Sequence, residues 1–135
     1  MPTIKRIIPL LVYKDIPATH DFLVKAFGFE AGGVERNAEG QPIHGEVYAG
    51  QATIWLHRAT AEHGLDSPGK SSGGLVVHVD DVDAHRERAR AAGAQIESEP
   101  QDQPYGQREY GGHRWWFATP NKLSRKQNQR RHKKP

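Results

Sequence analysis

An internal repeat constrains the fold of this chain more than any other feature of its sequence. At an offset of 65 positions, residues 10–30 align with residues 75–95 without a gap, and six pairs of residues are identical. Both copies consist of an apolar run rich in branched residues, an Asp, an amphipathic stretch and a closing Gly. We infer a duplicated unit of one strand and one helix.

Each copy contains signals for where its helix begins and ends. In the first copy a strand is expected over Ile7–Tyr13, and Asp15 and Pro17 predict a cap and a first helical turn. Gly28 ends this helix as a residue that tolerates positive φ. In the second copy, Asp80 or Asp81 is the expected cap, and the helix is predicted over Ala84–Ala92 with Gly93 closing it.

Short strand candidates follow each helix, so the order βαβββ is expected twice. The candidates lie around Val34 and at Ile43–Tyr48, Ala52–His57, Gln95–Ser98, Arg108–Tyr110 and Arg114–Ala118. Residues 59–74 have the composition of a linker, residues 97–106 are expected to form a loop, and Gly111-Gly112 predicts a two-residue hairpin turn. The repeat halves are therefore placed at residues 4–58 and 74–119 of one domain that spans residues 1–120.

The charge of the chain is concentrated at its C-terminal end. Residues 121–135 contain seven of the 19 Lys and Arg residues and no Asp or Glu, which predicts a basic, disordered tail. Contact of this tail with nucleic acid or acidic lipid is an alternative. No apolar run approaches the roughly 20 residues of a membrane-spanning helix, and no signal peptide is evident, so a cytoplasmic protein without a membrane partner is expected.

Several chemical classes are excluded by composition and motif. The chain has no Cys, which excludes disulfides, thiolate nucleophiles and Cys-based zinc sites. Neither a G-x-S-x-G elbow nor a phosphate-binding Gly motif follows a predicted strand. Any metal ion would therefore need His and carboxylate ligands.

The chain resembles the vicinal oxygen chelate superfamily, which includes glyoxalase I, extradiol dioxygenases and bleomycin-resistance proteins, and especially its small glyoxalase/bleomycin-resistance-like members. The resemblance covers about residues 4–119 and is carried, in order, by IIPLLVYKDIPATHDFLVKAFGFE, IHGEVYAGQATIWL, GLVVHVDDVDAHRERARAAGA and PYGQREYGGHRWWFATP. It implies an α+β fold in which two βαβββ modules form a curled mixed sheet around a cavity, commonly in a homodimer.

The resemblance also implies where a metal ion would be held. Metal-dependent members use four inward-facing side chains, one each on the first, fourth, fifth and eighth strands. By local motif these positions fall on Ile8, Trp55, Gly73 or Gly74, and Trp116, and none of these side chains can coordinate a metal. The usual chelate is therefore expected to be absent, and no cofactor is predicted.

Two tryptophans at these positions favour a flat aromatic ligand, although filling of a small core is the alternative for each Trp. The leading hypothesis is a metal-free protein of bleomycin-resistance type that binds and sequesters a small aromatic compound such as an antibiotic. No catalytic residue is assigned, and whether the chain is an enzyme stays open. The candidate ligand-binding residues are Trp55, Trp116, His57, His78, Arg114, Ile8, Leu10, Tyr48, Tyr105 and Tyr110.

Alternatives to this hypothesis remain. A metal-dependent lyase or dioxygenase of the same superfamily would need Zn, Ni, Mn or Fe on relocated ligands, for which His44, Glu46, His57 and His78 are the candidates. An interaction module that works through its basic tail is a third hypothesis.

Two structural details accompany these hypotheses. His20 and His85 are expected to face solvent. A register slip in the short Tyr110–His113 hairpin would turn Trp115 and Phe117 inward in place of Trp116.

Overall fold

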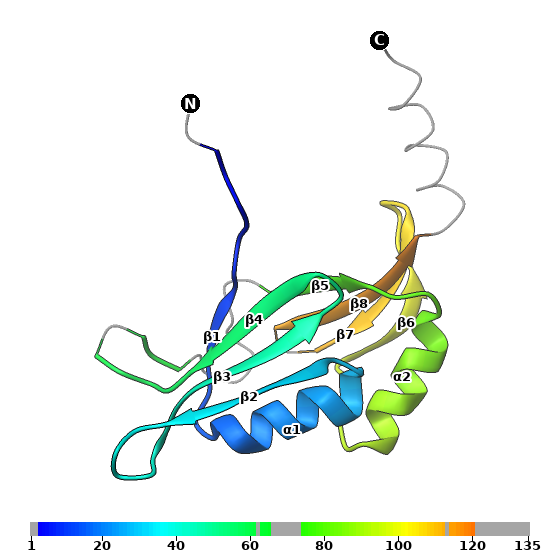
Figure 1. Ribbon diagram of the computed structural model, residues 1–135. Helices are drawn as coiled ribbons and strands as arrows, with labels where there is room; N and C mark the ends of the chain where they lie inside the picture. Colours follow the sequence, from blue (N-terminus) through cyan, green and yellow to red (C-terminus); the bar gives the residue numbers. More distant parts are fainter. Residues whose placement is uncertain (1–2, 62, 66–73, 113, 121–135) are drawn as a thin grey trace. The chain divides into compact units, whose positions relative to one another are not determined.

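The structure, a computed structural model, describes residues 3–61, 63–65, 74–112 and 114–120. The chain divides into two compact units, residues 1–66 and residues 67–135, and each is described by itself (Figure 1). The boundary between them falls inside the predicted linker, residues 59–74. Both units have the order βαβββ, as the repeat predicts. The basic tail lies outside the described residues.

The first module is a four-stranded mixed sheet with one helix. Its elements are β1 (Leu10–Val12), α1 (Ile16–Phe27), β2 (Glu30–Arg36), β3 (Pro42–Ala49) and β4 (Ala52–His57). The strand order is β1-β4-β3-β2, with β1 parallel to β4 and the other neighbours antiparallel.

Local sequence signals fix where α1 begins and ends. The Asp15 side chain accepts a hydrogen bond from the Ala18 N–H at 3.0 Å, and Pro17 stands in the first turn. Gly28 has φ 78° and closes the helix in the left-handed region. Both signals were predicted, and both are confirmed.

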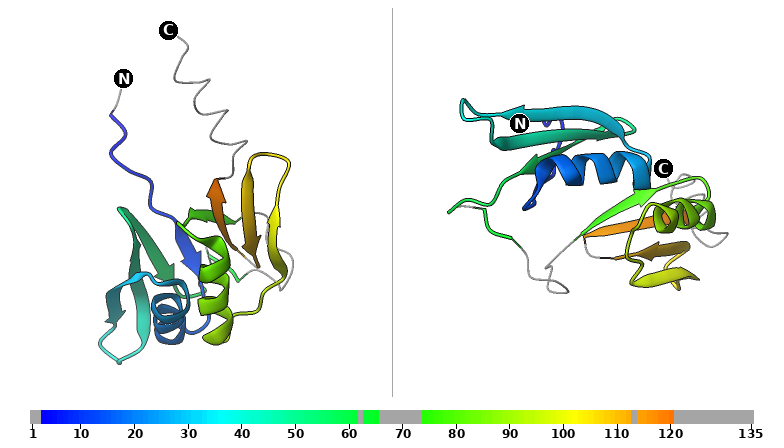
Figure 2. Two further views of the ribbon diagram at one scale, coloured as in Figure 1. Left: turned by 90° about the vertical axis from the view of Figure 1, so that its right-hand side faces the viewer. Right: turned by 90° about the horizontal axis from the view of Figure 1, so that it is seen from below.

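The second module repeats this architecture. Its elements are β5 (Leu75–His78), α2 (Val82–Ala91), β6 (Ser98–Asp102), β7 (Gln107–Gly111) and β8 (Trp115–Pro120), with the strand order β5-β8-β7-β6. Each helix lies along one face of its own sheet (Figure 2). Neither described helix is long and apolar enough to cross a membrane.

The structure corrects the repeat alignment by one residue over its first part. The caps are Asp15 and Asp81, which are 66 positions apart, whereas the closing Gly28 and Gly93 are 65 apart. In a strand, a shift of one residue exchanges the two faces of the sheet. Val12 is therefore the structural counterpart of His78 rather than of Val77.

The first strand is shorter than predicted. β1 covers Leu10–Val12 instead of Ile7–Tyr13, so Ile8 precedes the strand and Ile7 is 83% exposed. Pro9 stands directly before β1, and its carbonyl accepts the Trp55 N–H at 2.9 Å. Because Pro has no N–H to donate to a ladder, regular pairing starts only after it.

A strand occupies half of the segment predicted as a loop, residues 97–106. β6 covers Ser98–Asp102, not Gln95–Ser98, and pairs with β7 through a register shift between Ser98 and Gln101. Pro100 lies within this irregular stretch of an edge strand, where a missing N–H is tolerated. The Pro residues that suggested a loop are thus compatible with a bulged edge.

The hairpin between β7 and β8 turns later than predicted. Gly111 pairs with Trp116, and the Gly112 N–H donates to the Trp115 carbonyl at 3.0 Å, so Gly111 and Gly112 are not the central turn residues. The positive φ in this turn belongs to Arg114, at 73°. The pairing leaves Trp115 and Phe117 on the helix side of the sheet and Trp116 on the other side. The register slip that would have exchanged these side chains does not occur.

The two repeat histidines do not face solvent as expected. His20 is only 8% exposed, and its Nε2 accepts the Gly33 N–H at 3.2 Å, beside the irregular part of β2. His85 forms a 2.5 Å hydrogen bond with the Tyr110 hydroxyl and stacks on Phe117 with ring centroids 4.2 Å apart. Each helix is therefore tied to its sheet by a histidine.

Replacing His20 by Ala removes the partner of the Gly33 N–H and leaves space under α1. We expect the free energy of unfolding to fall by roughly 1–3 kcal/mol, measured by denaturant titration. The control is Glu39→Ala, at an exposed side chain in the turn between β2 and β3, for which a change within about 0.5 kcal/mol is expected. Equal losses in the two variants would contradict the anchoring role of His20.

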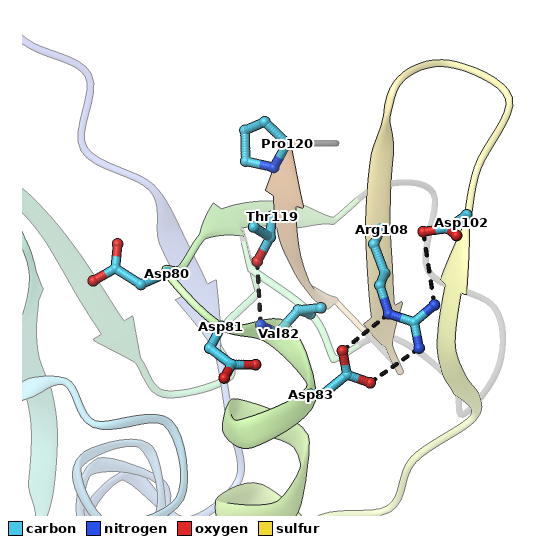
Figure 3. A pocket seen from close by; sticks show the side chains of 8 residues that line it. All are labelled: Asp80, Asp81, Val82, Asp83, Asp102, Arg108, Thr119 and Pro120. Carbon is cyan, nitrogen blue, oxygen red and sulfur yellow. Dashed lines mark hydrogen bonds and ion pairs between the residues drawn. The ribbon is translucent and has the colours of Figure 1, made fainter. Parts of the chain in front are cut away.

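The start of α2 is tied to β7 by an ion pair. Arg108 donates to both carboxylate oxygens of Asp83, at 2.9 and 3.0 Å, and Asp102 lies 3.7 Å away on the other side of the guanidinium (Figure 3). The Arg108 hydrogen bonds hold the pKa of Asp83 below its ordinary value. Asp83 therefore stabilises the fold above its unfolded-state pKa of about 3.9, and this contribution is lost as the pH falls through the lower folded-state pKa.

The Asp83→Asn variant should be less stable than the wild type at pH 7, by up to about 1 kcal/mol because the pair is partly exposed. Thermal unfolding from pH 7 to pH 2 should show this difference shrinking below about pH 3.9. Asp102→Asn, which removes only the 3.7 Å contact, should have a smaller effect. A difference that stays constant with pH would exclude the ionised Asp83 as its source.

Candidate ligand-binding faces

One sheet face in each module packs on the helix, and the opposite face carries the candidate residues. In the first module Val47, Ile54 and Leu56 are at most 3% exposed and form the helix-side core. Side chains alternate along a strand, so their neighbours belong to the opposite face, which we call the α1-distal face. Its members on β1, β3 and β4 are Leu10, Val12, His44, Glu46, Tyr48, Thr53, Trp55 and His57.

Trp55 lies between an apolar and a charged neighbour on the α1-distal face. Its backbone pairs with Leu10 on one side and Glu46 on the other. The His44 ring packs against the indole in a T-shaped arrangement, with centroids 5.3 Å apart and planes at 76°. The indole is partly buried, so part of its surface stays accessible.

Hydrogen bonds and burial set the charge of this face. The Tyr48 hydroxyl donates to Glu46 Oε2 at 2.8 Å, which raises the pKa of Tyr48, and His44 Nε2 lies 3.6 Å from Glu46 Oε1. Burial, followed by the nearby His63, His44 and Arg58, lowers the pKa of His57. The lowered pKa favours the neutral form of the His57 imidazole at pH 7.

The α2-distal face of the second module is built in the same way. Its members are Val76, His78, Gln107, Glu109, Gly111, Trp116 and Ala118. The Trp116 ring lies over Gly111, because a Cβ on Gly111 would be only 1.9 Å from Trp116 Cε3. Val76, beside Trp116, is 52% exposed, so an accessible apolar side chain borders this indole.

The two tryptophans occupy equivalent places in the two modules. Trp55 pairs with Leu10 of the parallel edge strand β1, and Trp116 pairs with Val76 of the parallel edge strand β5. Leu10 and Val76 are 66 positions apart, the offset that also relates the two helix caps. Each module thus presents one indole at the same point of its distal face.

Two further candidates, Tyr110 and Arg114, do not lie on these faces. Tyr110 is 2% exposed, faces α2 and stacks on Phe117, and burial raises its pKa. Arg114 stands in the turn before β8, is 9% exposed, and its carbonyl accepts the Leu75 N–H. Ile8 precedes β1, and Gly73 lies outside the described residues.

Residues that sequence reasoning did not select also contribute. Glu109 lies on the α2-distal face, accepts hydrogen bonds from Tyr105 and Gln107, and has its pKa raised by burial. Strand alternation along residues 107–111 was the signal that could have found it. The ring of His63 packs against His57 at 5.3 Å, but His63 lies in a loop where no periodicity points to it.

Hollows also lie at the starts of both helices. One hollow, of about 270 Å³, is lined by Asp80, Asp81, Asp83, Asp102 and Arg108 (Figure 3). The Arg108 guanidinium is already paired with the carboxylates of Asp83 and Asp102. Another of about 460 Å³ is lined by Lys14–Pro17 and Pro42. Neither lining includes an aromatic side chain, so these hollows do not suit a flat aromatic ligand.

The relocated metal site can be compared with the side chains directly. His44, Glu46 and His57 share the α1-distal face, and His78 belongs to the other module. Within the described part of the chain, no group of three or more His, Asp or Glu side chains is placed to hold a metal ion.

The chain is similar in sequence and in structure to known proteins. An uncharacterised protein of Mycobacterium bovis (strain ATCC BAA-935 / AF2122/97) is 33% identical over 124 residues, which covers 83% of this chain and 81% of that protein. The crystal structure of TioX from Micromonospora sp. ML1 is 30% identical, with a TM-score of 0.68, and covers 86% of this chain and 98% of TioX.

A second solved structure and the family match complete the comparison. TnmS3, an antibiotic binding protein from Streptomyces sp. CB03234, has a TM-score of 0.69 and 20% identity over 90% of this chain and 100% of TnmS3, which shows a shared fold. Residues 3–121 match the family described as Glyoxalase/Bleomycin resistance protein/Dioxygenase superfamily. The chain therefore belongs to this superfamily, as its motifs indicate.

Proposed function

We propose that this chain binds small aromatic molecules by stacking them on the indole that each module presents, Trp55 in the first and Trp116 in the second, without a metal ion. The observation that carries the proposal is the equivalent placement of the two indoles on the distal faces of duplicated modules. A tryptophan that only fills a core has no reason to recur at the same register position away from the helix.

The surroundings of each indole suit stacking. Trp116 lies over a glycine, so its ring is laid along the sheet and offers a flat surface next to the exposed Val76. Trp55 is held by the edge-to-face contact with His44. Aromatic rings preferentially bind other rings in offset-stacked or T-shaped arrangements, with a large apolar contact area.

The donor set at the family's metal positions supports binding without a metal. Ile8, Trp55, Gly74 and Trp116 offer neither an imidazole nitrogen nor a carboxylate oxygen. Sequestration needs no reaction, since binding alone lowers the concentration of free ligand. TnmS3, which shares the fold, is described as an antibiotic binding protein, and this supports a similar use here.

Stacking predicts a change in tryptophan fluorescence when a polycyclic aromatic antibiotic is titrated into the protein. Trp55→Ala and Trp116→Ala should each weaken binding at its own module's face by about tenfold or more, because a well-placed aromatic contact contributes roughly 1–3 kcal/mol. The control is Trp115→Phe, on the helix side, where Trp115 is 5% exposed and stacks on Phe117. This variant should bind like the wild type.

Two results would contradict the stacking proposal. One is an absence of any response to a panel of polycyclic and glycopeptide antibiotics. The other is a loss of affinity in Trp115→Phe that equals the loss in the two distal-face variants.

Metal content separates this proposal from the metal-dependent enzyme. After incubation with Zn, Ni, Mn or Fe(II) and desalting, elemental analysis of the untagged protein should find far less than one metal ion per chain. Near-stoichiometric retention that disappears in a His44→Ala/His57→Ala double variant would instead favour a lyase or dioxygenase with a relocated site.

A further inference from the structure

Glu46 is a charged group on the α1-distal face that the proposed stacking does not use. It lies on the interior strand β3, and its backbone is paired directly with Trp55. Directly opposed side chains on one face of an antiparallel pair have Cβ atoms about 4.5–5.5 Å apart. A ligand stacked on Trp55 is therefore within reach of the Glu46 carboxylate, whose side chain is 30% exposed.

The neighbours of Glu46 orient its carboxylate and leave it able to bind more. The Tyr48 hydroxyl donates to Oε2 at 2.8 Å, and the His44 Nε2 lies 3.6 Å from Oε1. An ionised carboxylate has about four lone-pair sites. One strong donor and one longer contact leave acceptor capacity for a group on a ligand.

The α1-distal face carries negative charge beside its aromatic rings. The backbone pairs Glu30 with Tyr48 and Glu35 with His44, which places both of these carboxylates on the same face as Glu46. The lowered pKa of His57 favours the uncharged imidazole at pH 7. Within the described residues, the ion-pair partner of Glu46 is His44 rather than a Lys or Arg.

We propose that Glu46 makes the α1-distal face selective for planar aromatic ligands that carry a protonated amine. The inference rests on the proposed function, because Trp55 supplies the surface on which the ring stacks. The carboxylate accepts a charge-assisted hydrogen bond from the ammonium group, and the indole attracts the same cation through its quadrupole. A neutral analogue has no positive charge, so it forms neither an ion pair with Glu46 nor a cation–π contact with Trp55, and Glu46 repels an anionic analogue.

A metal ion fits this face less well than an organic ammonium group. A divalent ion needs several His or carboxylate ligands, and no group of three is placed to supply them within the described residues. An ammonium group attached to an aromatic ring needs one carboxylate and one aromatic wall, which Glu46 and Trp55 provide.

The test uses three probes that share one ring system, namely 1-naphthylmethylamine, 1-naphthalenemethanol and 1-naphthoate. Calorimetric titration of the full chain at pH 7 should show the amine binding about tenfold more tightly than the alcohol, with the carboxylate weakest. Glu46→Gln keeps the side-chain shape and an acceptor oxygen for Tyr48. It should remove most of the amine's advantage over the alcohol and leave only the weaker cation–π contribution of Trp55.

The matched control is Glu39→Gln, in the turn between β2 and β3, which removes the same charge at a distance from Trp55. It should keep the preference for the amine. If both variants lose the preference equally, or if Glu46→Gln keeps it, the role of Glu46 is overturned. The proposed function still stands in that case if Trp55→Ala weakens binding of all three probes. If the wild type binds none of them, both the selectivity and the stacking are overturned for this face.

Discussion

The burial of one sheet face under a helix is the constraint on which the rest of each module depends. In the first module Ile16, Leu23 and Ala26 of α1 are at most 2% exposed. Val47 and Leu56, on the sheet face below the helix, are fully buried. Full burial of such a side chain contributes about 1.5–3 kcal/mol. Because side chains alternate along a strand, fixing the buried face also fixes the residues of the distal face. The position of Trp55 thus follows from the packing of its neighbours Ile54 and Leu56.

The two modules share this packing of a helix on one sheet face but differ in their polar contacts. His20 binds a backbone N–H of β2, whereas His85 binds the hydroxyl of Tyr110. Across from the indole, the first module has Glu46 and the second has Gly111. The first face therefore combines an indole with a carboxylate, and the second lays its indole along the backbone. The two modules therefore share one architecture but have chemically different distal faces.

Members of one superfamily can share this arrangement of strands and helices and still differ in chemistry. The strands that would carry metal ligands in metal-dependent members are all present here, and the family match spans residues 3–121. What differs is the side chain at each position, and Trp55 and Trp116 have no lone pair to offer a metal ion. The fold sets where a ligand would lie, and the residues at these few positions set what it can be.

The sequence by itself determined the order of elements, the beginning and end of α1, and the facing of Trp55. These features are local, since Asp15, Pro17 and Gly28 act within one turn of the helix and alternation acts within one strand. The tertiary structure decided the features that depend on pairing. It began the first strand only after Pro9, placed β6 across Pro100 and moved the hairpin turn to Arg114. It also settled the facing of Trp116, buried Tyr110 and His20, and joined His85 to the Tyr110 hydroxyl. These features depend on which backbone groups or side chains of another element a segment meets, and no local pattern specifies that partner.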